Sequence, residues 1–379
     1  MAAGAVTNLS VPFEAMMYNY DAVEDFGIHV TSSQPVSVYA MDYTKDGLSA
    51  AFTAYPTNLL GTNYCVMSFP SYSQFAIVAT ADNTTVNITP SPTADLEGSL
   101  WMNPITLQKG QTYLIDSANY GDDVTGTWIK SDKPIAVFSG AYYADVPIVQ
   151  AGAPNPLVQE QLPVESWGTQ TLGLSFAGRT NGDSYRVLAA YSNTVVTIAG
   201  IVVTITNEPV NGPWQVTKTN EVVVTTLDAG QFCDIIVEGP VVFQASNPIQ
   251  VAHFANGAVF DHGPPAFEGD PCEILLLPTG HYLLTNTVVT LPNDGIAGDF
   301  DENFLSIIVS WSAITNTVVD GSLVATNKFV AIGASGYYGA QIVMTNSGAH
   351  TVTSSKPVGI EIYGFGDSDA YSYFGGSVK

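Results

Sequence analysis

The chain has 379 residues, 46% of them hydrophobic, which supplies enough apolar material for two or three folded domains and argues against disorder. Ten Lys and Arg against 34 Asp and Glu give a formal net charge of −24, so nucleic acid is excluded as a partner, because a phosphate backbone requires a basic face. The same charge disfavours an anionic membrane surface, and no apolar run approaches the roughly 20 residues that cross a bilayer.

The N-terminal segment MAAGAVTNLS has neither a basic stretch nor an apolar core, so no signal peptide is expected there. Three cysteines, Cys65, Cys233 and Cys272, allow at most one disulfide and lack the spacing of a zinc site. Scarce Lys, abundant Thr, Asn, Gly and Tyr, and the acidic excess favour an extracellular or cell-surface protein over a cytosolic enzyme.

Four similar phrases recur along the chain, each with a Gly, an alternating apolar run, a polar turn, a Pro and a second alternating run. They are GIHVTSSQPVSVYA from Gly27, GTWIKSDKPIAVFS from Gly126, GPVVFQASNPIQVAHF from Gly239 and GAHTVTSSKPVGIEIY from Gly348. Alternation on both sides of a polar turn predicts a β-hairpin in each phrase. The Pro then has an architectural role, because its fixed φ suits a turn.

Three longer segments lie between these phrases, each with an apolar strand, an Asn-Thr turn and a second alternating strand. They are FAIVATADNTTVNI around Asn83, YRVLAAYSNTVVTI around Asn193 and LSIIVSWSAITNTVV around Asn316. This pattern predicts further hairpins. The first two segments continue into a strand, a Gly turn and another strand, at ITLQKGQTYLI and TTLDAGQFCDII.

Val, Ile, Thr, Tyr and Phe dominate the periodic stretches and no helical periodicity stands out, so the predicted fold class is all-β. The phrases recur roughly every 100 to 115 residues, the size of one β-sandwich. We therefore predict three tandem sandwich or jelly-roll repeats, with a closed β-propeller ring as the alternative. The predicted divisions are an N-terminal segment with the first hairpin (1–43) and three repeats (44–150, 151–262 and 263–379).

The phrases FAIVATADNTTVNI, ITLQKGQTYLI, GTWIKSDKPIAVFSG and VQEQLPVESWG resemble the N-terminal domain family of the IgGFc-binding protein. That protein is a large secreted mucus glycoprotein, and its domain also occurs in bacterial surface proteins. The similarity is densest from Phe75 to Gly168. It implies an extracellular, non-enzymatic module of an adhesion or matrix type, such as a bacterial surface member. Immunoglobulin is part of the family name, and the resemblance assigns no binding residue.

One acidic loop, NDGIAGDFDEN, is the predicted metal site. It gathers hard oxygen ligands of the kind that Ca²⁺ prefers, without the spacing of an EF-hand: Asp294, Asp299, Asp301, Glu302 and Asn303. A solvated acidic turn is the simpler interpretation. A weaker metal hypothesis joins His253 and His262 to the acids of the same Gly-Pro-rich loop, Asp261, Glu268 and Asp270, although their spacing fixes no coordination geometry.

Two functions are open at this point. The chain is predicted to be a non-enzymatic module that binds a glycan, an extracellular protein or copies of itself, through loops that carry Tyr142, Tyr143, Tyr337, Tyr338, Tyr371 and Tyr373. The alternative is a glycan-active enzyme with a carboxylate pair in a groove and stacking aromatic residues at Trp101, Trp167 and Trp214. No nucleophile elbow, Walker loop or HExxH motif supports the enzyme.

Overall fold

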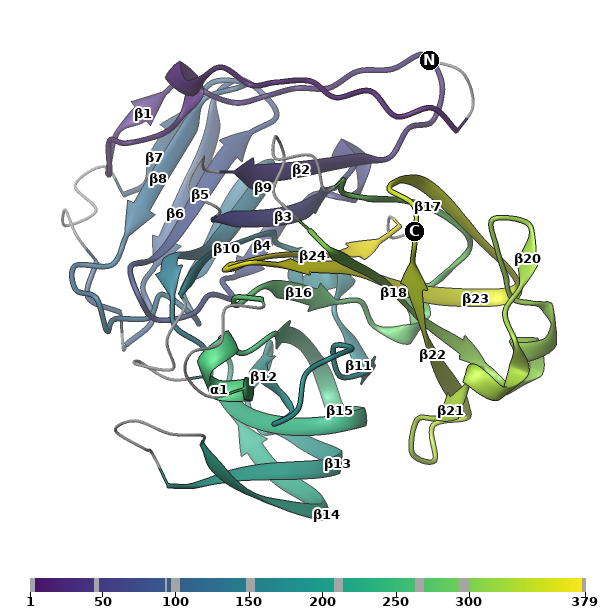
Figure 1. Cartoon of the computed structure of the whole chain (residues 1–379). Coiled ribbons are helices and arrows are strands. Elements are labelled where there is room, and N and C mark those ends of the chain that lie inside the picture. Colours follow the sequence, from purple (N-terminus) through teal and green to yellow (C-terminus); the bar gives the residue numbers. More distant parts are fainter. Residues whose placement is uncertain are drawn as a thin grey trace.

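The computed structural model describes residues 4–43, 48–92, 94–96, 103–147, 154–207, 214–262, 269–292 and 300–376 (Figure 1). Strands dominate these residues, so the all-β prediction is confirmed. The described helices are short: α1 (Ala258–His262) and the 3-10 segments η1 (Phe13–Ala15), η2 (Thr57–Leu59), η3 (Val164–Ser166), η4 (Thr279–His281), η5 (Trp311–Asn316) and η6 (Thr326–Lys328). None of these helices is long and apolar enough to span a membrane.

The strands form three large sheets and one small one. The first sheet contains β1 (Val23–Glu24), β4 (Gly61–Cys65), β5 (Ser73–Ala79), β6 (Thr84–Thr89), β7 (Ile105–Leu107), β8 (Thr112–Asp116), β9 (Trp128–Ala144) and β10 (Asn155–Glu160). The second contains β11 (Gly168–Gly173), β12 (Asp183–Ala189), β13 (Thr194–Asn207), β14 (Gln215–Leu227), β15 (Phe232–Phe254) and β16 (Glu273–Leu276).

The third sheet contains β17 (Leu283–Thr290), β18 (Glu302–Ser310), β19 (Val318–Val319), β20 (Ser322–Leu323), β21 (Val330–Ala331), β22 (Tyr337–Met344), β23 (Gly348–Gly366) and β24 (Asp369–Gly375). The small sheet is the pair β2 (Val38–Tyr43) and β3 (Ser49–Ala54). In Figure 1 the last strands of the three large sheets, β10, β16 and β24, lie with β3 of the small sheet at the centre of the molecule, where the sheets meet.

Each large sheet is organised around one long strand, β9, β15 or β23, of 17, 23 and 19 residues. Apart from β1, which pairs with β8, the first strand of every sheet (β4, β11, β17) pairs with this long strand, and so does the last (β10, β16, β24). The long strand also pairs with the two strands that follow the first (β5 and β6, β12 and β13, β18 and β19). This shared pairing supports the interpretation as repeats, whereas the described sheets show no closed propeller ring.

The predicted hairpins at the recurring phrases are wrong. Pro134 lies inside β9, which continues unbroken through SDKP. Residues 128–131 of β9 pair with β6 and residues 135–141 pair with β5, so the polar phrase marks the point where one strand changes neighbours. Pro134 occupies the unpaired interval between these two registers, where its missing N–H breaks no ladder hydrogen bond.

The Asn-Thr hairpins are wrong as well, although their strands exist. The chain turns at Asn83, whose φ is 52°, but β5 and β6 do not pair with each other. The long strand β9 lies between them, in the order β5-β9-β6. The short turn therefore connects two strands that lie on opposite sides of β9. The local sequence, a polar turn between two alternating runs, is the same for this arrangement and for a hairpin.

The N-terminal segment also differs from its prediction. Residues 25–37 contain no strand, so the first recurring phrase does not form a complete hairpin. Only its second half, β2, is extended, and it pairs with β3. The predicted divisions after residues 150 and 262 precede β10 and β16, which pair with the long strand of the preceding sheet.

Apolar side chains fill three clusters. One lies within the first sheet and contains Val137 of β9, which is fully buried in the alternating run IAVFS. A second lies mainly in the third sheet. The largest cluster joins all three sheets, from Cys65 in β4 to Phe374 in β24. The sheets are therefore packed on one another through a shared hydrophobic core.

Consecutive sheets also contact each other through an equivalent pair of residues. A Cβ atom added at Gly61 of the first sheet would lie 2.5 Å from Cβ of Pro163, and one added at Gly168 would lie 2.4 Å from Cβ of Pro278. Both Pro residues precede a 3-10 segment, η3 or η4. This close approach requires Gly at positions 61 and 168, because a larger residue there would separate the sheets.

Candidate functional site

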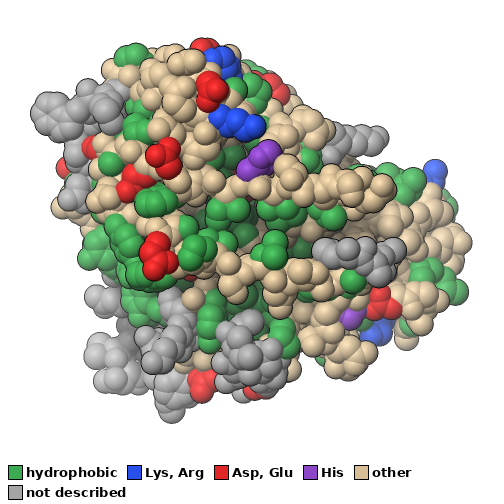
Figure 2. Space-filling model, turned by 90° about the horizontal axis from the view of Figure 1, so that it is seen from above, with side chains coloured by type: hydrophobic (Ala, Val, Ile, Leu, Met, Phe, Trp, Pro, Cys, Tyr) green, Lys and Arg blue, Asp and Glu red, His purple; other side chains and the backbone are tan. Residues whose placement is uncertain are grey.

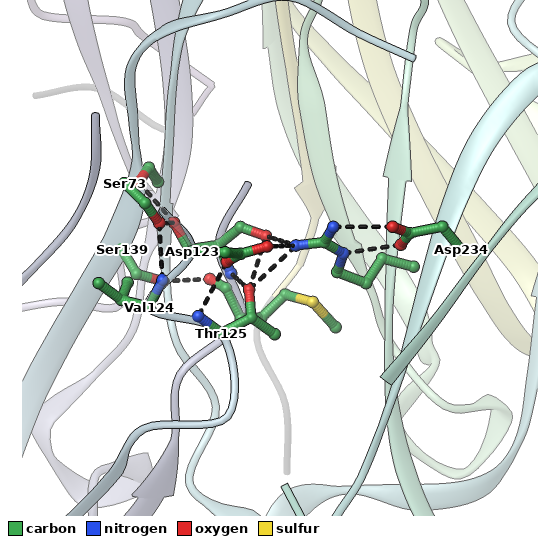
Figure 3. A network of polar contacts seen from close by, with 10 residues as sticks. Ser73, Asp123, Val124, Thr125, Ser139 and Asp234 are labelled. Atoms are coloured by element: carbon green, nitrogen blue, oxygen red, sulfur yellow. Dashed lines mark hydrogen bonds and ion pairs between the residues drawn. The ribbon is translucent and has the colours of Figure 1, made fainter. Parts of the chain in front are cut away.

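The boundary between the first and second sheets, which we call the seam, is bridged by Arg186 of β12. Its Nη1 donates to Asp123 Oδ2 at 2.5 Å and to the Ser68 carbonyl at 2.7 Å, and its Nε donates to Asp234 Oδ1 at 2.7 Å. Figure 3 shows Asp123 and Asp234 on opposite sides of the guanidinium. Burial opposes the charge, but the two carboxylates raise the pKa of Arg186 above its usual value.

Aromatic rings complete this bridge. The Arg186 guanidinium carbon lies 4.1 Å from the centroid of the Phe232 ring and 5.1 Å from that of Phe69. These contacts are within the range of cation–π attraction, and one ring comes from each side of the seam. Arg186 therefore fixes the two sheets against each other, and each of its three side-chain nitrogen atoms donates a hydrogen bond at the seam.

A groove of about 350 Å³ opens on the same seam. Thr89, Trp128 and Lys130 line it from the first sheet, and Ala190 and Ala229 from the second. Trp128 is half-buried, while Lys130 and Thr89 are exposed. The groove is thus built by the ends of β6 and β12, the start of β9, and the turn before β15.

Strand register places two amides in one row with Lys130. Lys130 of β9 lies opposite Asn63 of β4 and Asn87 of β6, and Trp128 lies opposite Thr89. Directly paired residues of antiparallel strands project from the same face, so the ammonium group lies in a row with two carboxamides beside the indole. The side chains of Lys130, Asn87 and Thr89 make no hydrogen bond or ion pair with any residue that the structure describes.

The predicted calcium loop is described only in part, because Asp294 and Asp299 lie outside the described residues. Asp301 and Glu302 are exposed at the start of β18. Asn303 is buried, where its amide nitrogen donates to the Leu291 carbonyl and its Oδ1 accepts from the Tyr371 hydroxyl. Asn303 therefore joins Leu291 to Tyr371, and the calcium hypothesis concerns the acids alone.

The second metal hypothesis gains no support. His253 Nε2 lies 3.0 Å from Asp183 Oδ2, and Asp261 forms an ion pair with Arg179 at 2.5 Å. Glu268 and the His262 side chain lie outside the described residues. No group of three His, Cys, Asp or Glu in the described part of the chain has the arrangement of a metal site.

His253 is fully buried between two aromatic rings. The Phe176 and Tyr185 rings stack on its imidazole, with centroids 4.1 and 4.4 Å away. Its second nitrogen, Nδ1, lies 3.8 Å from Glu361 Oε2 of the third sheet. Burial, and to a lesser extent Asp183, raise the pKa of Glu361 well above its usual value. The sequence offered no signal for this cluster, since its members are far apart along the chain.

The sequence reasoning also missed a set of buried carboxyl groups where the sheets meet. Burial raises the pKa of Glu160, Glu273 and Asp270 to about 8, and that of Asp369 to about 7. Asp369 accepts a hydrogen bond from Ser49 Oγ at 2.7 Å, whereas neither carboxyl oxygen of Glu273 has a hydrogen-bond partner among the described residues. The available signal was a Glu inside an apolar run, as in CEILLL.

The residues chosen for the glycan-active alternative do not form a groove in the described structure. Trp167 is buried and donates its indole N–H to the Leu162 carbonyl, and Trp214 packs on Phe260. Trp101 lies outside the described residues. Of the predicted contact tyrosines, Tyr371 and Tyr373 are buried, Tyr337 and Tyr338 are half-buried, and Tyr142 and Tyr143 are exposed.

One comparison with known proteins identifies a relationship. A family model described as IgGFc binding protein matches residues 50–364, which cover most of the chain, including the whole second sheet and all of the other two large sheets except β1, the last two residues of β23, and β24. No curated protein and no solved structure matches. The matched family is a family of binding proteins. The chain therefore belongs to the IgGFc-binding protein family.

Proposed function

We propose that this chain is an extracellular, non-enzymatic binding module whose ligand surface includes the groove at the seam. The lining of the groove carries the proposal: an indole, an ammonium group and a hydroxyl group surround it, and no carboxylic acid is among the lining residues. Glycoside hydrolysis requires a pair of carboxyl groups on either side of the bond that breaks. The lining residues therefore suit the binding of a ligand and lack the carboxyl pair that would hydrolyse a glycan.

The scaffold suits such a role. The Arg186 bridge and the shared apolar core hold the two walls of the groove in a fixed relation. A preformed site loses little entropy on binding. The buried His253 and Glu361 are inaccessible to a ligand, so these reactive side chains support the fold. Three tandem repeats, each built around one long strand, remain our proposal for the organisation of the chain.

The family name makes the immunoglobulin Fc fragment the first protein to test, and a bacterial-type surface location belongs to the same proposal. The purified chain is immobilised and exposed to the Fc fragment and to a set of polysaccharides, with surface plasmon resonance as the readout. The same polysaccharides are incubated with the chain and assayed for new reducing ends. Saturable binding without product supports the proposal, whereas release of reducing ends would overturn it in favour of the glycan-active alternative.

A further inference from the structure

We infer that the groove at the seam binds a terminal acidic sugar, with the carboxylate or sulfate group of the sugar on the Lys130 ammonium. This inference rests on the proposed binding function and names the ligand class of the same site. It is carried by the juxtaposition of Lys130, the half-buried Trp128 and Thr89 in the lining of the groove, with the exposed Asn87 directly opposite Lys130.

The charge of Lys130 makes the ligand an anion. Several other described cations already have partners: Arg179, Arg186 and Lys218 form ion pairs, the last with Glu238 at 2.5 Å. Lys109, Lys328 and Lys356 are exposed and have no ion-pair partner among the described residues, but they do not line the groove as Lys130 does. Lys133 Nζ donates to the backbone carbonyls of Asp82 and Asn83 at 2.7 Å.

Lys130 has no such partner in the described part of the chain, although acids exceed bases by 24 in the whole sequence. Figure 2 shows how sparse the basic side chains are on one face of the molecule, where acidic, polar and apolar groups surround them. An uncommitted ammonium group at the wall of a groove favours an anion at that position, because charge-assisted hydrogen bonds are the stronger ones.

The other side chains at the groove favour a sugar as the ligand. A pyranose ring has one apolar face and a rim of hydroxyl groups. The ring surface of Trp128 that lines the groove supplies apolar contact area, while the Thr89 hydroxyl in the lining and the exposed Asn87 amide beside Lys130 supply donors and acceptors for hydroxyl groups. A simple inorganic anion would leave the indole and the amide unused, and an apolar ligand would leave the ammonium desolvated without a partner.

The size of the groove limits the ligand to a chain end. Ligand sites in proteins usually measure about 300 to 1,000 Å³. At about 350 Å³ this groove is at the small end of that range, and it is open to solvent on one side between the two sheets. One terminal sugar would occupy it, with the rest of the glycan in solvent.

The test compares acidic and neutral sugars that are otherwise matched. The probes are 3′-sialyllactose, trigalacturonate and a sulfated chondroitin disaccharide, against lactose and chitotriose as neutral references. Isothermal titration calorimetry measures each dissociation constant for the full chain. We expect at least one acidic probe to bind at least tenfold more tightly than both neutral probes. Failure of every acidic probe to bind, or equal binding of neutral probes, would overturn the inference.

Two variants locate the site. Lys130→Gln should weaken the acidic probe by roughly tenfold, the loss expected for a hydrogen bond to a charged group. Lys109→Gln is the matched control, because it removes the same charge from an exposed position on the turn before β8, at the other end of β6. Trp128→Leu keeps apolar volume at the seam and removes the aromatic face, so it should weaken the probe as well.

The outcomes separate this inference from the proposed function. Acidic-probe binding that is unchanged in Lys130→Gln would show that the sugar binds elsewhere, and the inference would be wrong. If no sugar binds but the Fc fragment does, the binding function stands and only the inference fails. If neither sugars nor the Fc fragment bind and polysaccharides are cleaved, both fail. Equal melting temperatures of the variants and the unchanged chain show that folding is intact in each comparison.

Discussion

His253 of the second sheet and Glu361 of the third face each other across a fully buried interface, with Nδ1 of the imidazole 3.8 Å from Oε2 of the carboxyl group. Asp183 occupies the other side of the imidazole, and the hydroxyl-bearing rings nearest to the cluster are Tyr185, Tyr363 and Tyr282. Burial and the neighbouring Asp183 raise the pKa of Glu361, so a neutral Glu361 carboxyl group is the state compatible with this interface.

Substitutions at Glu361 test its charge state. Glu361→Gln replaces a neutral acid with a neutral amide of the same shape, so the free energy of unfolding at pH 7 should change by less than about 1 kcal/mol. Glu361→Ala leaves a cavity in the interface and should cost about 2 to 4 kcal/mol. Urea denaturation measures both values. Equal losses in the two variants would show that the carboxylate is ionised in the folded protein.

Removal of the Arg186 bridge should destabilise the seam. Arg186→Met leaves the buried Asp123 without its cation, and breaking a buried ion pair in this way costs about 3 to 5 kcal/mol. Lys218→Met is the control, since the Lys218–Glu238 pair is partly exposed and should contribute less than about 1 kcal/mol. Differential scanning calorimetry measures both. A similar small effect in both variants would contradict the assigned role of Arg186.

The buried carboxyl groups predict that stability falls as pH rises. The pKa values of Glu160, Glu273 and Asp270 are raised to about 8 in the folded chain, above the value of about 4 expected after unfolding. Their contribution to the free energy of unfolding is therefore fully present below pH 4 and is lost as the pH rises toward 8. Each group that behaves this way lowers the free energy of unfolding by about 1.4 kcal/mol per pH unit within that window.

This pH dependence is measured by urea denaturation at pH 5, 6, 7 and 8. Glu273→Gln removes one of the titrating groups. The slope of the free energy of unfolding against pH should therefore decrease by up to the effect of one proton, about 1.4 kcal/mol per pH unit. Glu221→Gln, on the exposed face of β14, should leave the slope unchanged. Stability that rises between pH 5 and pH 8 would show that these groups are ionised and paired in the folded protein.

The calcium hypothesis at the NDGIAGDFDEN loop has its own test. A site that uses Asp301 and Glu302 adds a saturable stabilisation that CaCl₂ gives and NaCl at equal ionic strength does not, roughly 2.7 kcal/mol at 100 times the dissociation constant. Asp301→Asn should abolish the calcium-specific stabilisation, while the stabilisation by ionic strength alone should remain unchanged. If the melting curves in the two salts superimpose, the loop is a solvated acidic turn.

Local sequence patterns predicted the strands correctly and their partners poorly. The run around Val137 gave the strand and its inward face, because alternation depends only on burial of one side. The turn at Asn83 was also recognised from its polar residues. The pairing was missed, because a short turn between alternating runs has the same composition whether its strands pair directly or lie on opposite sides of β9.

The candidate site was not predictable for a related reason. Trp128 and Lys130 lie within a recurring phrase whose sequence indicates only strands and turns. The residues on the other side of the groove, Ala190 and Ala229, lie in turns next to β12 and β15 of the second sheet. Only the packing of two sheets creates the groove. The family resemblance from Phe75 to Gly168, in contrast, was evident from the strand and turn phrases themselves, and the family match over residues 50–364 supports it.

Ligand binding without cleavage at the seam between the first two sheets is tested by hydrogen–deuterium exchange of the full chain, with and without saturating 3′-sialyllactose and separately with the Fc fragment. We expect slower exchange in the segments that border the groove, residues 86–92, 126–132, 187–193 and 226–232, with both ligands recovered intact. Slower exchange confined to the third sheet, or a cleaved ligand, would show that the seam is not a binding site of this kind.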